Sequence, residues 1–339
     1  MLISIIRQVK LFYSTSDQIQ NLASRISQTN FYYQLAKLKI EKQRLKDERG
    51  PFNLVIETSN FCNARCLMCP YPRMKRVKKI MDKKTFTKIL ERISQEKLSV
   101  NKVFFSGLGE PLSDPDLVSR IARVKELGFW VRLYTNASLL TPEISRQLVE
   151  LGLNEVNISF NGVTPEQYRK IMSLDFAKTV ANINCLIEQK RKFGKRLPKT
   201  QISLIAIEEN RQTVERHFQN WVGKVDSVTV SRAHEWGGKI KSKIKNQKLK
   251  MVYPCRSLWH TFNIDSQGNF VICCRDFESK YILGNIQTHS FAEIQRSTVL
   301  KHFRRLHLSY SQWKLPKICQ FCNFPYQEGV EWFLPRSID

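Results

Sequence analysis

Short apolar runs alternate with longer amphipathic stretches between residues 52 and 232. Short runs rich in Val, Ile, Leu and Phe predict strands, and apolar residues at helical spacing predict helices. The expected strands are residues 53–58, 102–107, 130–134, 155–160, 200–207 and 226–231. The expected helices lie near residues 82–96, 115–127, 141–151, 176–193 and 210–221.

Several expected helices are preceded by residues that typically begin a helix, either a capping side chain or a proline in the first turn. These residues are Asp82, Asp114-Pro115, Thr141-Pro142 and Thr164-Pro165. Strands that alternate with helices predict an α/β protein with a parallel sheet and right-handed crossovers. The pattern alone leaves open whether the sheet forms a partial barrel or an open doubly wound sheet.

The two ends of the chain differ from this alternating part. Residues 1–50 are expected to form a basic, helical N-terminal extension that packs against the rest of the protein or lies on a membrane surface. Residues 233–250 are expected to be a basic linker. Strands, turns and cysteines dominate residues 251–339, which predicts a separate small module. Inside it, the apolar runs 261–264 and 269–273 flank a turn-rich segment and predict a hairpin.

The composition is that of a globular protein with many grouped cysteines. The chain has 339 residues, of which 42% are hydrophobic, so it can bury a large core. No apolar run reaches the roughly 18 residues that a membrane span needs. Nine cysteines, mostly in CxxxCxxC, CC and CxxC groupings, fit metal ligation in a reducing compartment better than a disulfide framework. We therefore expect a cytoplasmic protein.

The net charge of +25 is unusual for an enzyme that acts on small neutral molecules, and two basic runs, 73–84 and 239–250, contribute to it. Such a charge attracts anionic partners: phosphorylated or nucleotide-linked metabolites, RNA, acidic lipid headgroups or an acidic reductase. A solvated, solubilising surface explains the same charge. Few aromatic residues stand near these lysines, so a platform for single-stranded nucleic acid is not expected.

Cys62, Cys66 and Cys69 stand in the segment NFCNARCLMCP, directly after the first expected strand. A cubane 4Fe–4S cluster normally takes four thiolates. A CxxxCxxC loop supplies three, which leaves one iron open to another molecule. The alternatives are redox thiols and a zinc site, and zinc with this spacing would need a fourth ligand from elsewhere.

This loop resembles the signature of the radical S-adenosylmethionine (SAM) enzymes. The resemblance implies that the open iron chelates the amino and carboxylate groups of SAM. Reductive cleavage of SAM then gives a 5′-deoxyadenosyl radical, which abstracts a hydrogen atom from the substrate. The resemblance also implies a partial (β/α)6 TIM-like barrel over residues 51–232, with the chemistry at the carboxyl ends of its strands.

Three further segments resemble the SAM-binding parts of that family. FFSGLGEP resembles the GGE motif, in which Leu108 displaces the first glycine; LYTN resembles the Thr-Asn-Gly segment, with Ala137 in place of glycine; and VNISFNG resembles a segment whose serine contacts the SAM ribose or carboxylate. The resemblance implies that the SAM-binding residues are Gly107, Gly109, Glu110, Asn136 and Ser159.

A second constellation comprises Cys255, Cys273, Cys319 and Cys322. Cys255 and Cys273 belong to a C-x12-G-x4-C pattern around the expected hairpin, and the CxxC pair follows a helix expected near 290–306. The pattern resembles the start of the SPASM/twitch modules of radical SAM enzymes. The resemblance implies a twitch-like module with one auxiliary 4Fe–4S cluster. A zinc ribbon uses the same four ligands and is the alternative.

Two cysteines remain. Cys274 adjoins Cys273, and the alternation of side chains along a strand predicts that it points away from its neighbour. Cys274 is the catalytic candidate, as a hydrogen-atom donor to a substrate radical. Cys185 lies in an apolar helical stretch and is expected in the core, which makes it a weaker candidate for the same role.

We therefore expect a radical SAM enzyme of the oxidoreductase or epimerase type that acts on an anionic, sugar-like or other small metabolite. A maturase of a ribosomal peptide is the first alternative. A non-catalytic iron–sulfur or zinc protein that binds nucleic acid is the alternative of a different class. An electron donor such as flavodoxin or ferredoxin is expected to reduce the cluster.

Overall fold

The computed structural model describes residues 30–233, 236, 253–309, 311–320 and 322. Its strands form one sheet in the order β6-β5-β4-β3-β2-β1-β7-β8-β9. They are β1 (Phe52–Ile56), β2 (Val100–Phe105), β3 (Trp130–Thr135), β4 (Glu155–Ser159), β5 (Lys199–Ala206), β6 (Ser227–Arg232), β7 (Thr261–Ile264), β8 (Asn269–Val271) and β9 (Ile282–Asn285). β1 to β6 pair in parallel, as the strand and helix alternation predicts.

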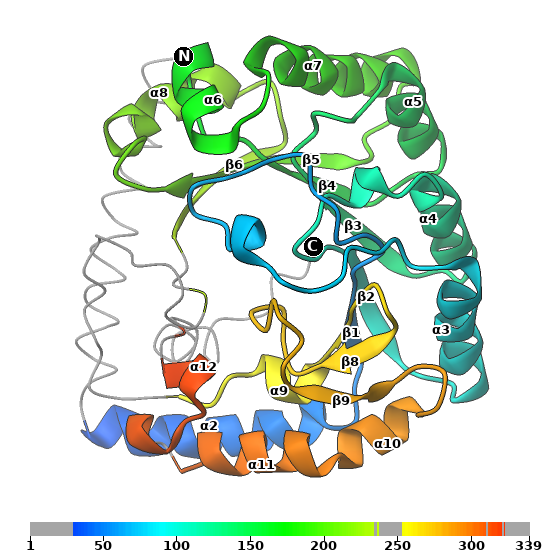
Figure 1. Ribbon diagram of the computed structural model, residues 1–339, viewed down its shortest axis with the longest axis vertical. Coiled ribbons are helices and arrows are strands. Elements are labelled where there is room, and N and C mark those ends of the chain that lie inside the picture. The colour runs from blue at the N-terminus through cyan, green and yellow to red at the C-terminus, as the bar shows by residue number, and fades with distance from the viewer. Residues whose placement is uncertain (1–29, 234–235, 237–252, 310, 321, 323–339) are drawn as a thin grey trace.

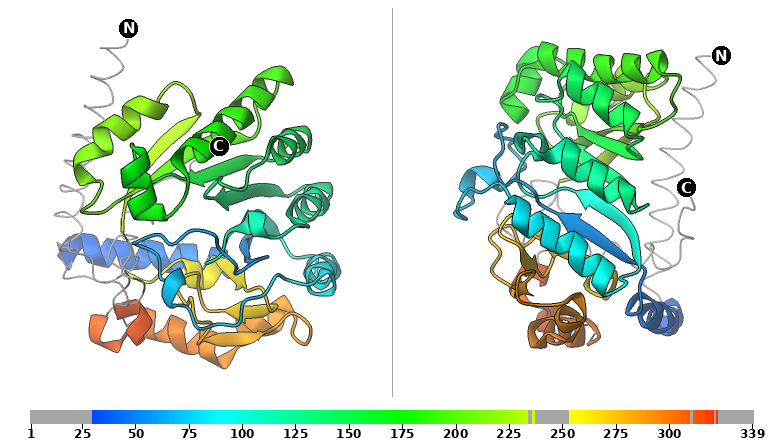
Figure 2. Two further views of the ribbon diagram at one scale, coloured as in Figure 1. Left: turned by 45° about the horizontal axis from the view of Figure 1, so that its top comes forward. Right: turned by 90° about the vertical axis from the view of Figure 1, so that its right-hand side faces the viewer.

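Helices cover the convex face of this curved sheet (Figures 1 and 2). They are α3 (Lys83–Gln95), α4 (Leu117–Glu126), α5 (Pro142–Glu150), α6 (Pro165–Met172), α7 (Phe176–Lys192) and α8 (Val214–Trp221). Residues of one face of each strand, such as Val131 and Leu133 of β3, are fully buried in the main core, whereas Arg132 and Tyr134 on the other face stay partly exposed. This alternation follows from the two-residue period of a strand. The sheet is the partial, TIM-like barrel that the sequence analysis expects.

Local capping explains why several helix starts are where the sequence places them. The side chains of Asp82, Thr141 and Thr164 accept hydrogen bonds from the backbone three residues later, at the starts of α3, α5 and α6. α4 differs, because it begins at Leu117 and not at the expected Asp114-Pro115 pair. Asp114 instead forms a 2.8 Å ion pair with the buried Arg120.

The C-terminal module shares the sheet of the barrel. The expected hairpin is β7 and β8, and β7 also pairs in parallel with β1. The other elements of the module are α9 (Ser257–His260), α10 (Phe291–Arg296), α11 (Thr298–His307), η4 (Gln312–Lys314) and α12 (Lys317–Gln320). The single helix expected near 290–306 is two helices, α10 and α11, because Ser297 between them is extended.

The described part of the N-terminal extension is α2 (Asn30–Asp47), which lies beside the C-terminal module in Figure 1. Asp47 at its end accepts a 2.7 Å hydrogen bond from Arg256, next to α9. Residues 1–29 and most of the basic linker expected over 233–250 lie outside the described residues. Within the described part of the chain, no helix combines the length and apolarity that crossing a bilayer requires.

Candidate functional site

Hydrogen bonds of Asn60 join the two ends of the loop that follows β1. Its side chain donates to the Val77 carbonyl over 2.8 Å and accepts from the Lys79 amide over 2.6 Å. Its own amide donates to the Lys79 carbonyl over 3.1 Å. The first cysteine loop, defined here as residues 61–76, therefore leaves and rejoins the sheet edge at one point.

Backbone hydrogen bonds fix the three cysteines within this loop. The Cys62 amide donates to the Tyr71 hydroxyl over 2.8 Å, and the Cys69 amide donates to the Cys66 carbonyl over 3.0 Å. The Leu67 amide donates to the Ile171 carbonyl over 2.9 Å, which attaches this part of the loop to α6. Tyr71 belongs to a short helical turn, η1 (Tyr71–Arg73), directly after the third cysteine.

Burial controls the acidity of these thiols. It raises the pKa of Cys62 to about 12, and it raises the pKa of Cys66 and Cys69 as well. Negative charge on Cys62 or Cys69 raises the pKa of Cys66 further, so the thiols oppose each other's ionisation. Such a donor set ionises only when a cationic centre compensates the charge, and an iron–sulfur core does so.

Close contact with the first cysteine loop explains Gly109. A Cβ atom on Gly109 would lie 2.2 Å from the Ser59 carbonyl oxygen, so only glycine fits there. The next residue, Glu110, donates its amide to the Phe61 carbonyl over 2.6 Å. The loop after β2 thus lies directly against the cysteine loop.

The carboxylate of Glu110 is a buried brace. One oxygen accepts from the Thr135 hydroxyl over 2.6 Å and from the Leu112 amide over 3.1 Å, and the other accepts from the Asn136 amide over 2.7 Å. Burial raises the pKa of this carboxyl. Its side chain joins the loop after β2 to the end of β3 and the residue that follows it.

Asn136 reaches back to the first cysteine loop. Its Nδ2 donates to Oδ1 of Asn63 over 3.0 Å, and Asn63 donates in turn to the Ser138 hydroxyl over 2.7 Å. Ala137, between Asn136 and Ser138, has φ +58°, in the left-handed region where glycine is favoured. Asn63 and Ser138 therefore belong to the site, although no spacing or motif in the sequence singles them out.

Ser159 is the last residue of β4, so it lies at the same edge of the sheet as Asn136, which follows β3. Its backbone stands beside Ser203 of β5. The carboxyl ends of parallel strands meet at one edge of the sheet, where ligands of such folds bind. All the residues that the resemblance assigns to SAM lie at this edge.

The second constellation gathers on a small apolar cluster of the C-terminal module. Burial, and then the charges of nearby cysteines including Cys319 and Cys322, raise the pKa of Cys273. The Cys255 amide donates to Nδ1 of the buried His307 over 3.2 Å. Cys255, Cys273 and Cys319 pack against the same buried residues, which are Leu258, Trp259, Ile272, Leu300 and Phe303.

The described cysteines of neither constellation are arranged to bind a single metal ion. Within the described residues, no three His, Cys, Asp or Glu side chains are close enough to hold one metal ion. A cubane takes one thiolate per iron, so its ligands lie further apart than those of one ion. Partly buried thiols in groups of three and four are the donor set that iron–sulfur clusters use.

Cys274 and Cys185 differ from these cysteines. Cys274 is exposed whereas Cys273 is partly buried, so the two neighbours face different surroundings as expected. The strand alternation is not the cause, because β8 ends at Val271 before either cysteine. Cys185 is partly exposed on α7 and is not in the core, where it was expected.

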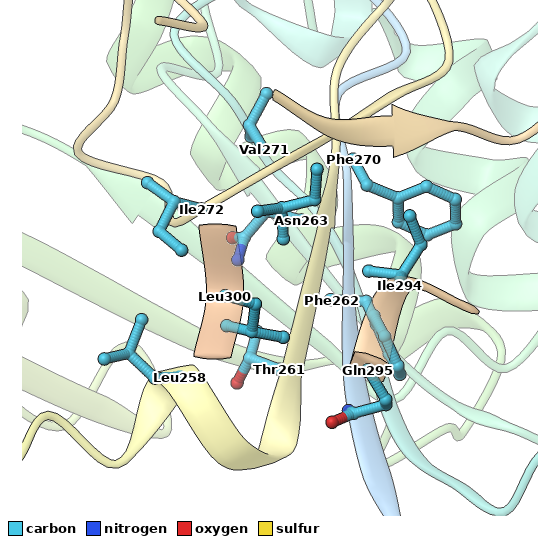
Figure 3. A pocket seen from close by; sticks show the side chains of 11 residues that line it. Leu258, Thr261, Phe262, Asn263, Phe270, Val271, Ile272, Ile294, Gln295 and Leu300 are labelled. Carbon is cyan, nitrogen blue, oxygen red and sulfur yellow. The ribbon is translucent and has the colours of Figure 1, made fainter. Parts of the chain in front are cut away.

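A small pocket lies in the C-terminal module and not between the cysteine loops (Figure 3). It is lined by apolar side chains of α9, β7, β8, β9, α10 and α11 and by the polar side chains of Thr261, Asn263 and Gln295. The buried Nδ2 of Asn263 has no hydrogen-bond partner within the described part of the chain. Leu258, Ile272 and Leu300 line this pocket and also belong to the apolar cluster against which the cysteines pack. The pocket therefore adjoins the second constellation.

Two protein families match the chain. The radical SAM superfamily matches residues 56–219, and SPASM, an iron–sulfur cluster-binding domain, matches residues 255–323. The first match contains the first cysteine loop, and the second contains the second constellation.

Among curated proteins, the chain is 29% identical over 159 residues to a tungsten-containing aldehyde ferredoxin oxidoreductase cofactor-modifying protein of Pyrococcus furiosus, which covers 46% of this chain and 44% of that protein. It is 34% identical over 127 residues to the PqqA peptide cyclase of Bradyrhizobium diazoefficiens, which covers 37% of this chain and 33% of that enzyme. The chain thus spans less than half the length of these relatives.

Among solved structures, the fold is similar to that of Streptococcus suis SuiB bound to the precursor peptide SuiA. The TM-score is 0.62 at 16% sequence identity, and the match covers 79% of this chain and 70% of SuiB. At this level of identity the likeness establishes the fold alone.

Proposed function

Because the chain belongs to the radical SAM superfamily and carries a SPASM iron–sulfur domain, we propose that it modifies a ribosomally made precursor peptide. These domains imply a SAM-binding 4Fe–4S cluster, auxiliary iron–sulfur clusters and SAM itself. When bound, the first cluster and SAM supply a hydrogen-abstracting 5′-deoxyadenosyl radical.

Cys62, Cys66 and Cys69 hold the first cluster in this proposal. Their burial in one loop, tied to α6 and to the GLGE segment, supports that role. A buried site also keeps water from a reactive intermediate.

The SAM ligands are assigned to the adjoining sheet edge. The backbone of Gly107 and Gly109 faces SAM, Glu110 braces that backbone, and Asn136 and Ser159 provide polar contacts. The hydrogen bonds of Glu110 to Thr135 and Asn136 support the division of labour between carboxylate and backbone.

Cys255, Cys273, Cys319 and Cys322 hold one auxiliary cluster. Their common apolar support favours this assignment over separate thiols. When bound, such a cluster would supply an acceptor for one electron from the oxidised substrate, and a crosslinked peptide would then be lighter by two hydrogen atoms. Cys274, exposed beside Cys273, remains the candidate hydrogen-atom donor for the alternative outcome, an epimerised residue.

The observation that carries the peptide substrate is the 34% identity to a PqqA peptide cyclase. The likeness of the fold to a SuiB structure that contains a precursor peptide agrees with it. From the sequence alone we expect a small anionic metabolite first and a peptide second; the similarity to the peptide cyclase supports the second option, which we therefore propose here. The sheet also ends at β6 in the described part of the chain, which leaves a strand edge of the kind that extended peptides pair with.

We further propose a reducing, cytoplasmic setting and an acidic electron donor of the flavodoxin or ferredoxin class. The grouped free cysteines and the net charge of +25 support both.

The test is deuterium transfer from candidate peptides. Short open reading frames beside the gene supply the candidates, which are synthesised with deuterium on their carbon-bound positions. The proposal expects deuterium in 5′-deoxyadenosine and a peptide that is lighter by two hydrogen atoms or epimerised. Deuterium transfer from a phosphorylated or nucleotide-linked sugar, and none from any peptide, would overturn the peptide assignment.

A further inference from the structure

A buried ion pair joins the first cysteine loop to the end of β1. The two terminal nitrogens of Arg76 each donate over 2.8 Å to one carboxylate oxygen of Glu57. The two side chains are only 10% and 8% exposed. A two-pronged pair of this kind fixes the orientation of both partners as well as their distance.

Arg76 also binds the C-terminal module. Its Nε donates to the Phe277 carbonyl over 2.7 Å, and one of its terminal nitrogens lies 3.8 Å from the carboxylate of Asp265 in the hairpin turn. The preceding residue, Lys75, donates its amide to the Glu278 carboxylate over 3.1 Å. The end of the first cysteine loop therefore runs along the segment that follows Cys273.

Glu57 passes this contact on to the GLGE segment. Its carboxylate accepts from the Leu108 amide over 3.0 Å and from the Ser266 amide over 3.3 Å. A Cβ atom on Gly107 would lie 2.4 Å from Cγ of Glu57, so the backbone of Gly107 rests directly on this side chain. The position of Glu57 thus determines where residues 107 and 108 lie.

We propose that Arg76 is a positioning residue through which the C-terminal module sets the SAM-binding geometry of the GLGE segment. The connection runs from Phe277 through Arg76 and Glu57 to Leu108, and every link in it is a direct hydrogen bond. The inference rests on the proposed role of residues 107–110 in binding SAM. It is independent of the identity of the substrate.

Arg76→Lys is the informative variant. Lysine keeps the positive charge beside the buried Glu57, which prevents the loss of folding that an unpaired buried carboxylate causes. An ammonium group lacks the planar fork, so it cannot hold both carboxylate oxygens and also bind the Phe277 carbonyl. The variant therefore loosens the connection without removing the charge.

The measurement is the affinity of the anaerobically reconstituted, unreduced protein for SAM. Electron paramagnetic resonance spectra of the reduced clusters, with and without SAM, accompany it. The proposal expects Arg76→Lys to bind SAM about tenfold more weakly. At a SAM concentration near the wild-type Kd, the signal of the first cluster should respond less to SAM in the variant than in the wild type, and the auxiliary signal should be unchanged. Equal SAM affinity in the variant and the wild type would overturn the proposal.

Arg120→Lys is the matched control. Arg120 forms a buried pair with Asp114, with side chains 4% and 0% exposed, and it also contacts the Met81 carbonyl, the Asp116 carboxylate and the Phe86 ring. This substitution is expected to lower the melting temperature and to leave SAM affinity unchanged. If it weakened SAM binding as much as Arg76→Lys does, the effect would be one of general stability, and the positioning role would fail.

A double variant tests whether the C-terminal module acts on SAM binding through Arg76. Glu278 accepts from the Lys75 amide, so Glu278→Ala loosens the backbone that carries Arg76 along the C-terminal module. It should weaken SAM binding when Arg76 is present and have no further effect in the Arg76→Lys background. Equal weakening in both backgrounds would contradict a connection through Arg76. A wild-type protein that carries its clusters and does not bind SAM would instead refute the proposed function itself.

Discussion

The Asn136 amide donates a 2.7 Å hydrogen bond to the buried carboxylate of Glu110, which joins the loops after β2 and β3. Both oxygens of this carboxylate accept hydrogen bonds from other groups. In Glu110→Gln, the side-chain NH2 group replaces one accepting oxygen and faces a group that itself donates a hydrogen bond. We expect the free energy of unfolding to fall by about 1.5–3 kcal/mol, the range for a buried hydrogen bond to a charged group.

Urea unfolding of the reconstituted protein measures this loss. Glu143→Gln on α5 is the control, because the side chain of Glu143 is 58% exposed and its ion pair with Arg146 lies on the surface. Little change in the free energy of unfolding is expected there, because surface substitutions of this kind rarely alter stability. Equal effects of the two substitutions would contradict the bracing role of Glu110.

Ala137 occupies a backbone conformation, φ +58°, that costs a residue with a Cβ about 1 kcal/mol. Ala137→Gly should therefore raise the free energy of unfolding by up to ~0.6 kcal/mol, because the greater freedom of glycine in the unfolded chain offsets ~0.4 kcal/mol or more of the relieved strain. Ala181→Gly inside α7 should lower it by about 1 kcal/mol. Thermal unfolding of both variants checks the opposite signs, and destabilisation by both would show that Ala137 is unstrained.

His217 makes the stability of the barrel depend on pH. Burial lowers its pKa from 6.5 to about 4. Between these values the unfolded chain binds a proton that the folded chain excludes, so stability decreases as the pH falls from 6.5 to 4. The loss amounts to about 3 kcal/mol.

His217→Phe tests this dependence, because an aromatic ring keeps the stacking on Phe160, whose ring centre lies 6.2 Å away. Unfolding measured at several pH values should show a shallower acid decline in the variant than in the wild type. Parallel curves would assign the acid sensitivity to other groups.

Cys319→Ala separates SAM cleavage from the fate of the substrate. Removal of one ligand of the auxiliary site should leave 5′-deoxyadenosine formation at saturating SAM and reduce product formation to background. The ratio of 5′-deoxyadenosine to product, measured by mass spectrometry, reports the effect. Cys185→Ala on α7 is the control and should keep the wild-type ratio. Unchanged coupling in Cys319→Ala would remove the auxiliary cluster from the reaction.

Local chemistry made much of the fold predictable. Asp82, Thr141 and Thr164 mark helix starts because a capping side chain acts on the backbone three residues away, within one turn. The cysteine spacing and the glycines of the GLGE segment likewise carry their meaning in a few consecutive residues.

Contacts between distant segments were not predictable in this way. Arg76 and Glu57 meet across 19 residues and Asn136 and Asn63 across 73, and no spacing rule relates such pairs. The parallel pairing of β7 with β1 is not predicted for the same reason. The turn between β7 and β8 is visible in the sequence, but nothing in the sequence shows that β1 is the other neighbour of β7. The break at Ser297 depends on a single extended residue in an otherwise helical pattern.

Release of 5′-deoxyadenosine from SAM by the reconstituted, chemically reduced protein is the most direct test of a three-thiolate cluster with an open iron. The account predicts release by the wild type, loaded with about eight irons for two cubanes, and none above background by Cys66→Ala. No release by the fully loaded wild type, or undiminished release by Cys66→Ala, would contradict it.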